Sequence, residues 1–250
     1  MEADAYNRSV RLRAVFSVFL GVFPVFVACG GTAPDAERPR AAPADPPAAA
    51  HAQPATARST VPRIIVLGDS LTAGLGLDLK DNFPSRLQQR LDEKGYEFEV
   101  VNAGVSGDTS AGGRRRLEWA MADGNPRILV VALGGNDGLR GLPPDQLEAN
   151  LAAIIEQGQA RGLSVVLAGM EAPPNFGADY TARFRAVYPT LAARYQIPLI
   201  PFLLEGVAGD PAFNQSDGIH PNQRGAQVVA DLVWRTLEPA LDQARSTTPR

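Results

Sequence analysis

The sequence has little of the residue types that build disulfides and metal centres. Among its 250 residues there are one cysteine and two histidines, and 24 basic side chains nearly balance 27 acidic ones. A single cysteine excludes an intramolecular disulfide framework and any zinc or iron–sulfur site made of cysteine clusters. Two histidines argue against a histidine-rich metal centre. The net charge of −3, without a basic stripe, argues against nucleic acid as a partner.

Charge is also missing from one segment near the start. Residues 14–28 carry no charged side chain and hold four of the ten phenylalanines, and Arg8, Arg11 and Arg13 precede them. A basic start followed by about 15 apolar residues is typical of an export signal, whereas a bilayer span needs about 20. We therefore predict that residues 1–28 are a signal peptide and that the protein works outside the cytoplasm, in the periplasm.

The only cysteine, Cys29, follows this run directly, after Val27-Ala28 and before Gly30-Gly31. The segment resembles the lipobox of bacterial lipoproteins, although Phe26 stands where leucine is usual. The resemblance implies a lipidated Cys29 that anchors the protein to a membrane. Two alternatives stay open: a plain cleaved signal that ends nearby, and an uncleaved anchor.

A proline- and alanine-rich stretch comes next. Residues 30–62 contain 7 proline and 11 alanine residues and almost nothing large to bury. Such a composition cannot offset the entropy lost on ordering, so we predict a disordered tether over residues 29–62. His51 lies within it and receives no role. The folded domain is expected over residues 63–245, with a disordered tail at 246–250.

Short β-branched apolar runs alternate with helical stretches in this domain. The runs are Ile64–Leu67, Phe98–Val101, Ile128–Leu133, Val165–Met170 and Ile197–Phe202. Unbroken runs of this kind are typical of parallel strands buried on both faces. Between them, residues 145–158 carry one apolar stripe, and a last helix is expected with Pro221 in its first turn. The pattern predicts a doubly wound α/β fold, a flavodoxin-like three-layer sandwich around a five-stranded parallel sheet.

Ligands of such sheets bind at the carboxyl ends of the strands, and polar clusters occur there. The first is Gly68-Asp69-Ser70-Leu71. Ser70 at a strand-to-helix turn can present its hydroxyl at the edge of the sheet. The alternative is that Asp69 or Ser70 only caps the next helix.

The second and third clusters are rich in glycine. Gly104 follows the second strand within Asn102–Thr109, where a ligand oxygen can approach the backbone closely. Asn136 follows the third strand within Gly134–Gly138, and it either points its amide into a site or occupies a left-handed turn. No GxxxxGK[ST] phosphate loop occurs in the sequence.

The fourth cluster, Asp217-Gly218-Ile219-His220-Pro221, precedes the last helix. His220 is the only histidine of the folded domain. An aspartate three residues upstream can orient its imidazole and stabilise the protonated form, as a general base for a serine requires. The alternatives are a capping Asp217 with a solvated His220, and part of a metal site that lacks further ligands.

The four clusters together resemble the SGNH or GDSL hydrolase family, over residues 63–240. The resemblance implies Ser70 as nucleophile, His220 as general base and acid, and Asp217 as the residue that orients it. It also implies an oxyanion hole formed by Ser70, Gly104 and Asn136, with no cofactor and no metal. Asp69 is then structural, holding the first turn. The activity implied is ester hydrolysis through an acyl-serine intermediate.

Substrate choice is argued from two loops. Leu75, Leu77 and Phe176 are expected to contact an acyl chain, with ordinary packing as the alternative. Related enzymes accept aryl esters, thioesters and lysophospholipids, so we expect a small ester or lysolipid substrate and a monomeric enzyme. The alternatives are a carbohydrate deacetylase on the same fold and a non-catalytic binding protein. Sugar platforms would favour the deacetylase, but Trp119 and Trp234 lie in helical stretches where core packing is expected.

Overall fold

The computed structural model describes residues 61–246. The predicted signal peptide, the lipidation site at Cys29 and nearly all of the predicted tether lie outside the described residues. The predicted tail at 246–250 also lies outside them, apart from residue 246.

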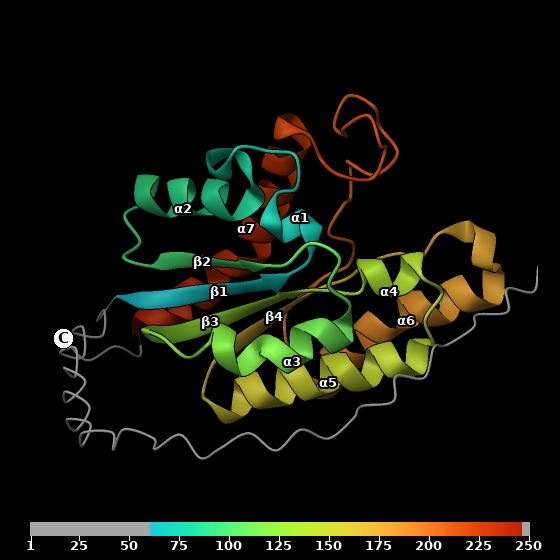
Figure 1. The fold of residues 1–250 in the computed structure, drawn as a ribbon. Helices are drawn as coiled ribbons and strands as arrows, with labels where there is room; N and C mark the ends of the chain where they lie inside the picture. Colours follow the sequence, from blue (N-terminus) through green and yellow to red (C-terminus); the bar gives the residue numbers. More distant parts are fainter. Residues whose placement is uncertain (1–60, 247–250) are drawn as a thin grey trace, which may run out of the picture. The chain divides into compact units, whose positions relative to one another are not determined.

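Five parallel strands form one sheet in the centre of the described part (Figure 1). They are β1 (Pro62–Gly68), β2 (Glu99–Gly104), β3 (Asn125–Ala132), β4 (Ser164–Ala168) and β5 (Leu199–Ile200). Their order is β2-β1-β3-β4-β5, so the direction of winding reverses between β1 and β3. In doubly wound sheets this switch point opens a crevice at the carboxyl ends of the two strands. The predicted flavodoxin-like five-stranded fold is confirmed.

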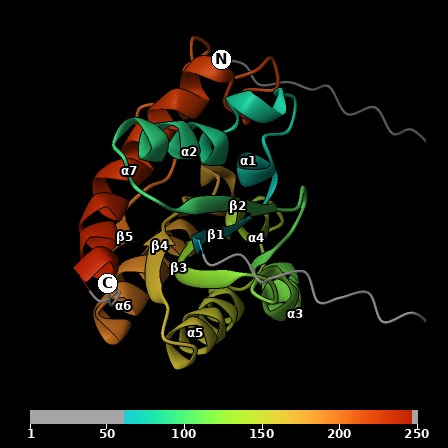
Figure 2. The same cartoon turned by 90° about the vertical axis from the view of Figure 1, so that its left-hand side faces the viewer.

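Helices cover both faces of the sheet (Figures 1 and 2). One face packs against α2 (Phe83–Glu93) and α7 (Gln223–Ser246), which also contact each other. The other face carries α3 (Ser110–Ala120), α5 (Pro144–Ala160) and α6 (Ala178–Tyr195). Four short turns of helix complete the described part of the chain: α1 (Ser70–Ala73), η1 (Leu79–Asp81), α4 (Gly135–Leu139) and η2 (Pro174–Phe176). The layers leave the carboxyl ends of the strands as the edge where a site can form.

Two expectations about burial need correction. Strands β1, β3 and β4 bury most of their residues, but β2 buries only Ala103, because it is an edge strand. Trp234 packs in the core as expected, whereas Trp119 is 76% exposed on α3. Trp119 lies in the last turn of α3, on the part of that helix farthest from the carboxyl ends of the strands.

The start of the last helix also differs from the expectation. Pro221 pairs with Asn214 in an isolated bridge, and α7 begins two residues later. The Asn222 side chain accepts hydrogen bonds from the N–H groups of Arg224 and Gly225, so it caps the helix. Within residues 61–246 no helix combines the length and apolar character that crossing a bilayer requires.

Candidate active site

Ser70 stands where β1 turns into α1. At this turn a Cβ on Gly68 would lie 1.9 Å from Thr72 Oγ1, so only glycine lets the helix begin so close to the strand. Asp69 is the N-cap of α1, and its Oδ1 accepts the N–H of Leu71 at 3.0 Å. The capping role therefore falls to Asp69, and the hydroxyl of Ser70 is left for another contact.

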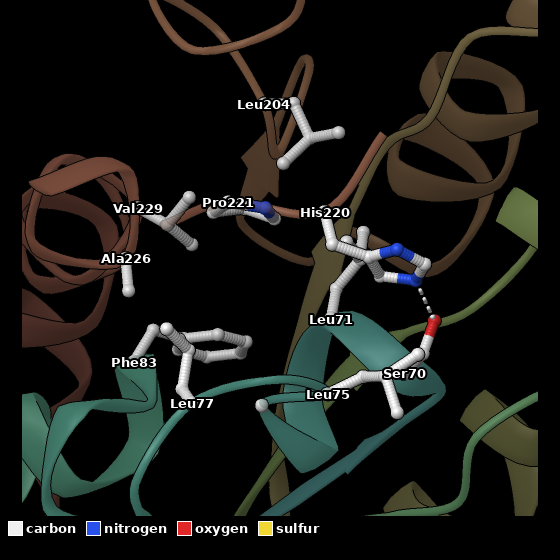
Figure 3. Close-up of a pocket in the computed structure, with 11 residues that line it drawn as sticks. Ser70, Leu71, Leu75, Leu77, Phe83, Leu204, His220, Pro221, Ala226 and Val229 are labelled. Carbon is white, nitrogen blue, oxygen red and sulfur yellow. Dashed lines mark hydrogen bonds between the residues drawn. The ribbon is translucent and has the colours of Figure 1, made fainter. Parts of the chain in front are cut away.

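That contact is with His220, 150 residues later in the chain. The imidazole Nε2 lies 2.9 Å from Ser70 Oγ (Figure 3). The other ring nitrogen, Nδ1, lies 2.7 Å from Asp217 Oδ2. Oδ1 of Asp217 accepts the backbone N–H groups of Ile219 and His220 at 2.9 and 3.0 Å. These backbone hydrogen bonds, with the His220 side chain, lower the pKa of Asp217 to about 2. Asp217 is therefore ionised at neutral pH and holds one nitrogen of the ring, while the other faces the serine.

Asn136 enters the same site from the switch-point side. Gly134 adopts a φ of 115°, and a Cβ there would lie 2.0 Å from the Tyr188 hydroxyl, so the turn needs glycine. The left-handed position is thus Gly134 rather than Asn136. The Asn136 amide nitrogen donates to the carbonyl of Asp108 at 2.9 Å and approaches Asp69 Oδ2 at 3.3 Å. Asn136 therefore faces the pocket, which its side chain lines beside Ser70.

Asp69 is the buried acid of this site. It is only 3% exposed, and burial raises its pKa to about 6, against the hydrogen bond from Leu71 and the charge of His220. Above that pH its carboxylate is ionised and can accept from both Leu71 and Asn136. Asp69 thus links the turn that carries Ser70 to the turn that carries Asn136.

The structure places Gly104 outside the pocket, contrary to the expectation. Its N–H donates to the side chain of Asn102 at 3.0 Å, and a Cβ there would lie 2.3 Å from the backbone nitrogen of Ala73. Gly104 therefore allows α1 to pack directly on the end of β2. Gly107, three residues later, lines the pocket instead, with a φ of 84°.

Sequence reasoning missed Gly107, although this residue lies within the second cluster, Asn102–Thr109. Within residues 61–246 the N–H groups of Gly107 and Ser70 have no intramolecular acceptor, and the Gly107 carbonyl accepts from Arg140 at 2.9 Å. The signal that pointed to this position is a glycine in a turn, three residues beyond the end of the strand. Several glycines follow that strand, so the sequence did not single out this one.

A pocket of about 600 Å³ opens over Ser70 and His220. Its polar lining comes from Asp69, Ser106, Asn136 and Glu171, and no lysine or arginine lines it. The remaining wall is largely apolar and includes Leu71, Leu75, Leu139, Met170, Ala172, Pro173, Pro174, Phe202, Leu204, Ala208 and Ile219. A concave apolar pocket with a few convergent polar groups has the form of a small-molecule site.

Only one of the three residues expected to touch an acyl chain lines this pocket, namely Leu75. Leu77 lines a void of about 10 Å³ on another side of His220, together with Phe83, Ala226 and Val229 (Figure 3). A void of that size has room for about one water molecule, so it cannot hold an acyl chain. Phe176 stacks on Tyr180, with ring centroids 5.2 Å apart, and is not among the lining residues. No group of three or more His, Cys, Asp or Glu side chains among the described residues is placed to hold a metal ion.

Comparison with known proteins gives consistent matches. Residues 66–228 match the model of the GDSL-like Lipase/Acylhydrolase family. Esterase TesA of Pseudomonas aeruginosa is 45% identical over 186 residues, which cover 74% of this chain and 92% of that protein. Thioesterase 1/protease 1/lysophospholipase L1 of Escherichia coli K12 is 38% identical over 179 residues, covering 72% of this chain and 85% of that protein.

The solved structure of an esterase also has the fold of this domain. The psychrotrophic esterase EstA from Pseudoalteromonas, in a structure inhibited by monoethylphosphonate, superposes with a TM-score of 0.68 at 30% identity. The match covers 72% of this chain and 98% of that one, so the solved relative consists of little more than this domain. The prediction of an esterase of this family is confirmed, and the chain belongs to the GDSL-like lipase/acylhydrolase family.

Proposed function

We propose that the protein hydrolyses uncharged carboxylic esters through an acyl intermediate on Ser70. The observation that carries this proposal is the line of contacts from Asp217 through His220 to Ser70 at the floor of an apolar pocket. A neutral imidazole 2.9 Å from the hydroxyl is placed to take its proton as the oxygen attacks. Asp217 stabilises the imidazolium that forms, because it is ionised and bonded to the other ring nitrogen.

Attack of Ser70 Oγ on the ester carbonyl gives a tetrahedral intermediate with a negatively charged oxygen. We assign its stabilisation to the N–H groups of Ser70 and Gly107 and to one N–H of Asn136, which turns to the oxygen from its 3.3 Å contact with Asp69, since all three residues line the pocket. Collapse expels the alcohol, which takes the proton from His220 and leaves the acyl group on Ser70. A water molecule, deprotonated by His220, then releases the acid and restores the serine.

The residues that line the pocket favour a substrate whose acyl chain carries no charge. Its wall is mostly aliphatic, and the charged or titratable lining residues are Asp69, Glu171 and His220. An anionic acyl or leaving group would find no basic partner there. Aryl esters, acyl esters of short to medium length, thioesters with small thiols and zwitterionic lysophospholipids, whose headgroup cation balances the phosphate, therefore suit the pocket better than acyl-coenzyme A, which has a net negative charge.

The carbohydrate deacetylase alternative has less support. Phe202 is the only aromatic side chain among the lining residues. Trp234 is buried and Trp119 lies away from the site, on the last turn of α3. A sugar platform of stacked aromatic rings is therefore missing from the described pocket.

The test is hydrolysis of p-nitrophenyl esters of increasing chain length, a lysophospholipid and an acetylated sugar. We expect ester cleavage that Ser70→Ala abolishes and that an ethylphosphonate ester blocks, with the added mass on the peptide that contains Ser70. Ser164→Ala, at the amino end of β4, is the matched control and should keep full activity. Equal activity or equal labelling in Ser70→Ala would contradict the proposal.

We further propose that the protein is exported and held at a membrane through Cys29. The support is the basic start, the apolar run at residues 14–28 and the cysteine that follows it. Replacing Cys29 by serine should move the protein from the membrane fraction to the soluble periplasmic fraction. Unchanged fractionation would contradict lipidation.

A further inference from the structure

Exposed apolar side chains are concentrated at the edge of the domain that carries the pocket. Eight large hydrophobic residues are exposed among the described residues, and six of them lie on segments that follow the carboxyl ends of the strands. We call these six the apolar rim: Leu75 and Leu79 after β1, Val105 after β2, Leu139 after β3, Phe176 after β4, and Ile219 after β5. Each of the five strands is thus followed by at least one member.

Half of the rim belongs to the wall of the pocket. Leu75, Leu139 and Ile219 line it directly, and Val105 precedes the lining residues Ser106 and Gly107. The short helices α1 and α4 and the loop before α7 meet on this side of the domain, where the strands end (Figure 1). Exposed apolar side chains that belong to a pocket wall, with others on the neighbouring segments of the same edge, mark a surface that another apolar body covers.

We propose that the apolar rim seats the pocket on a phospholipid surface, so that an ester enters from the surface rather than from free solution. The inference rests on the proposed function, because a lysolipid or acyl ester is an amphiphile that resides in such a surface. When the rim lies on the lipid, the acyl chain of the ester packs against the apolar wall of the pocket, and its carbonyl group reaches Ser70. Contact through exposed apolar side chains is how proteins lie on a membrane without crossing it.

The length of the chain before β1 permits this orientation. Residues 30–61 separate Cys29 from the start of β1, which lies at the edge opposite the rim. A chain of that length can extend to about 100 Å at ~3.3 Å per residue. A domain of this size has a diameter of about 40 Å. An anchor at Cys29 can therefore reach past the domain to the same membrane that the rim contacts, which a link of a few residues would prevent.

The test measures binding of residues 52–250 to large unilamellar phosphatidylcholine vesicles by flotation. The relatives solved as this domain alone indicate that it folds without the preceding chain. All proteins carry Ser70→Ala, so no lipid is hydrolysed and the result does not depend on activity. The rim variant is Leu79→Ser with Val105→Ser, two residues that do not line the pocket.

The matched control is Trp119→Ser. Trp119 is 76% exposed and Leu79 is 82% exposed, but only Leu79 belongs to the rim. We expect the parent domain to bind the vesicles, the rim variant to bind about tenfold more weakly, and the control to bind like the parent. With Ser70 restored, the rim variant should hydrolyse soluble p-nitrophenyl acetate like the parent, which also shows that it is folded.

Three results would overturn the proposal. One is a parent domain that does not bind the vesicles, and another is an equal loss of binding in the rim variant and in Trp119→Ser. The third is a parent domain that is dimeric in sedimentation and becomes monomeric in the rim variant, since the rim would then be covered by a second copy. Loss of ester hydrolysis in the unmodified protein would instead contradict the proposed function, and it would leave the vesicle result standing.

Discussion

Arg116 donates from Nε to Asp108 Oδ2 at 2.5 Å and joins three segments that converge on the site. Its two other nitrogens donate to the carbonyls of Gly68 and Ala103, both at 2.7 Å. Gly68 ends β1 directly before Asp69-Ser70, and the carbonyl of Asp108 accepts the amide of Asn136. One guanidinium therefore links the turn that carries Ser70, the end of β2 and the loop of Gly107.

We expect Arg116→Lys to lower kcat about tenfold with little change in KM, because an ammonium cannot reach all three acceptors in the fixed geometry of a guanidinium. Steady-state kinetics on a p-nitrophenyl ester measures this. Arg115→Lys, at the exposed neighbouring position, is the control and should match the parent. A loss of thermal stability in Arg116→Lys with unchanged kcat would show that Arg116 only holds the fold.

The two glycines after β2 should respond differently to alanine. Gly104→Ala places a Cβ 2.3 Å from the backbone nitrogen of Ala73, so we expect a loss of about 1–3 kcal/mol in unfolding free energy. Its kcat at 25 °C should change little while the protein stays folded. In Gly107→Ala the new Cβ makes only an ordinary contact with Arg140 Nη2, at 3.9 Å, but its φ of 84° strains the loop, and we expect kcat to fall at least about tenfold.

Denaturant unfolding and kinetics on both variants distinguish the two glycines. A large loss of kcat in Gly104→Ala, with normal kcat in Gly107→Ala, would return the oxyanion-hole role to Gly104.

Asp217→Asn should lower kcat by about 10²–10⁴-fold, because the amide cannot stabilise the imidazolium and favours the wrong tautomer of His220. Since the pKa of Asp217 is lowered to about 2, this residue stays ionised through the working range. Loss of activity on mild acidification should therefore not come from protonation of Asp217. Asp210→Asn, on an exposed turn, is the control, and equal losses of kcat in both variants would contradict the role of Asp217.

Asp69 should make the fold less stable as the pH rises. Its pKa is raised from 3.8 to about 6 by burial, so the folded state binds the proton more tightly than the unfolded state. The resulting stability is present below about pH 4 and is lost as the pH rises through about 6, by on the order of 3 kcal/mol. Urea unfolding at pH 4.5 and pH 7.5 measures it, and Asp69→Asn should remove the difference that comes from this residue.

An unchanged pH dependence in Asp69→Asn would contradict that burial effect. The same variant should lower kcat, because its amide group would face the amide of Asn136 in place of an acceptor.

Sequence patterns predicted the central strands of the sheet better than the strands at its two edges. The apolar runs at the centre of the sheet became β1, β3 and β4, and the stripe in residues 145–158 lies within α5. The fifth run shortened to the two residues of β5, and β2 proved to be a half-exposed edge. A run of apolar residues records local preference for burial, but not which strand lies at an edge.

The residues of the site also fall into two groups, those that the sequence could predict and those that it could not. Ser70, Asp217 and His220 were predictable because few residue types suit a nucleophile, its base and the carboxylate that orients it, and one histidine remained in the domain. Gly104 and Gly107 were not separable, because both are glycines near the end of one strand. Only packing decides between them: α1 covers Gly104, and the pocket opens over Gly107.

By itself, therefore, the amino-acid sequence determined the family, the order of strands and helices along the chain, and the candidate residues for acyl transfer. These depend on residue chemistry and periodicity, which are local. The tertiary structure alone decided the 2.9 Å approach of His220 to Ser70, the burial that raises the pKa of Asp69, and the presence of the exposed side chains of Leu75, Leu139 and Ile219 in the wall of one pocket. Each of these joins residues far apart in the chain, and such distances exist only once the sheet has closed between its two layers of helices.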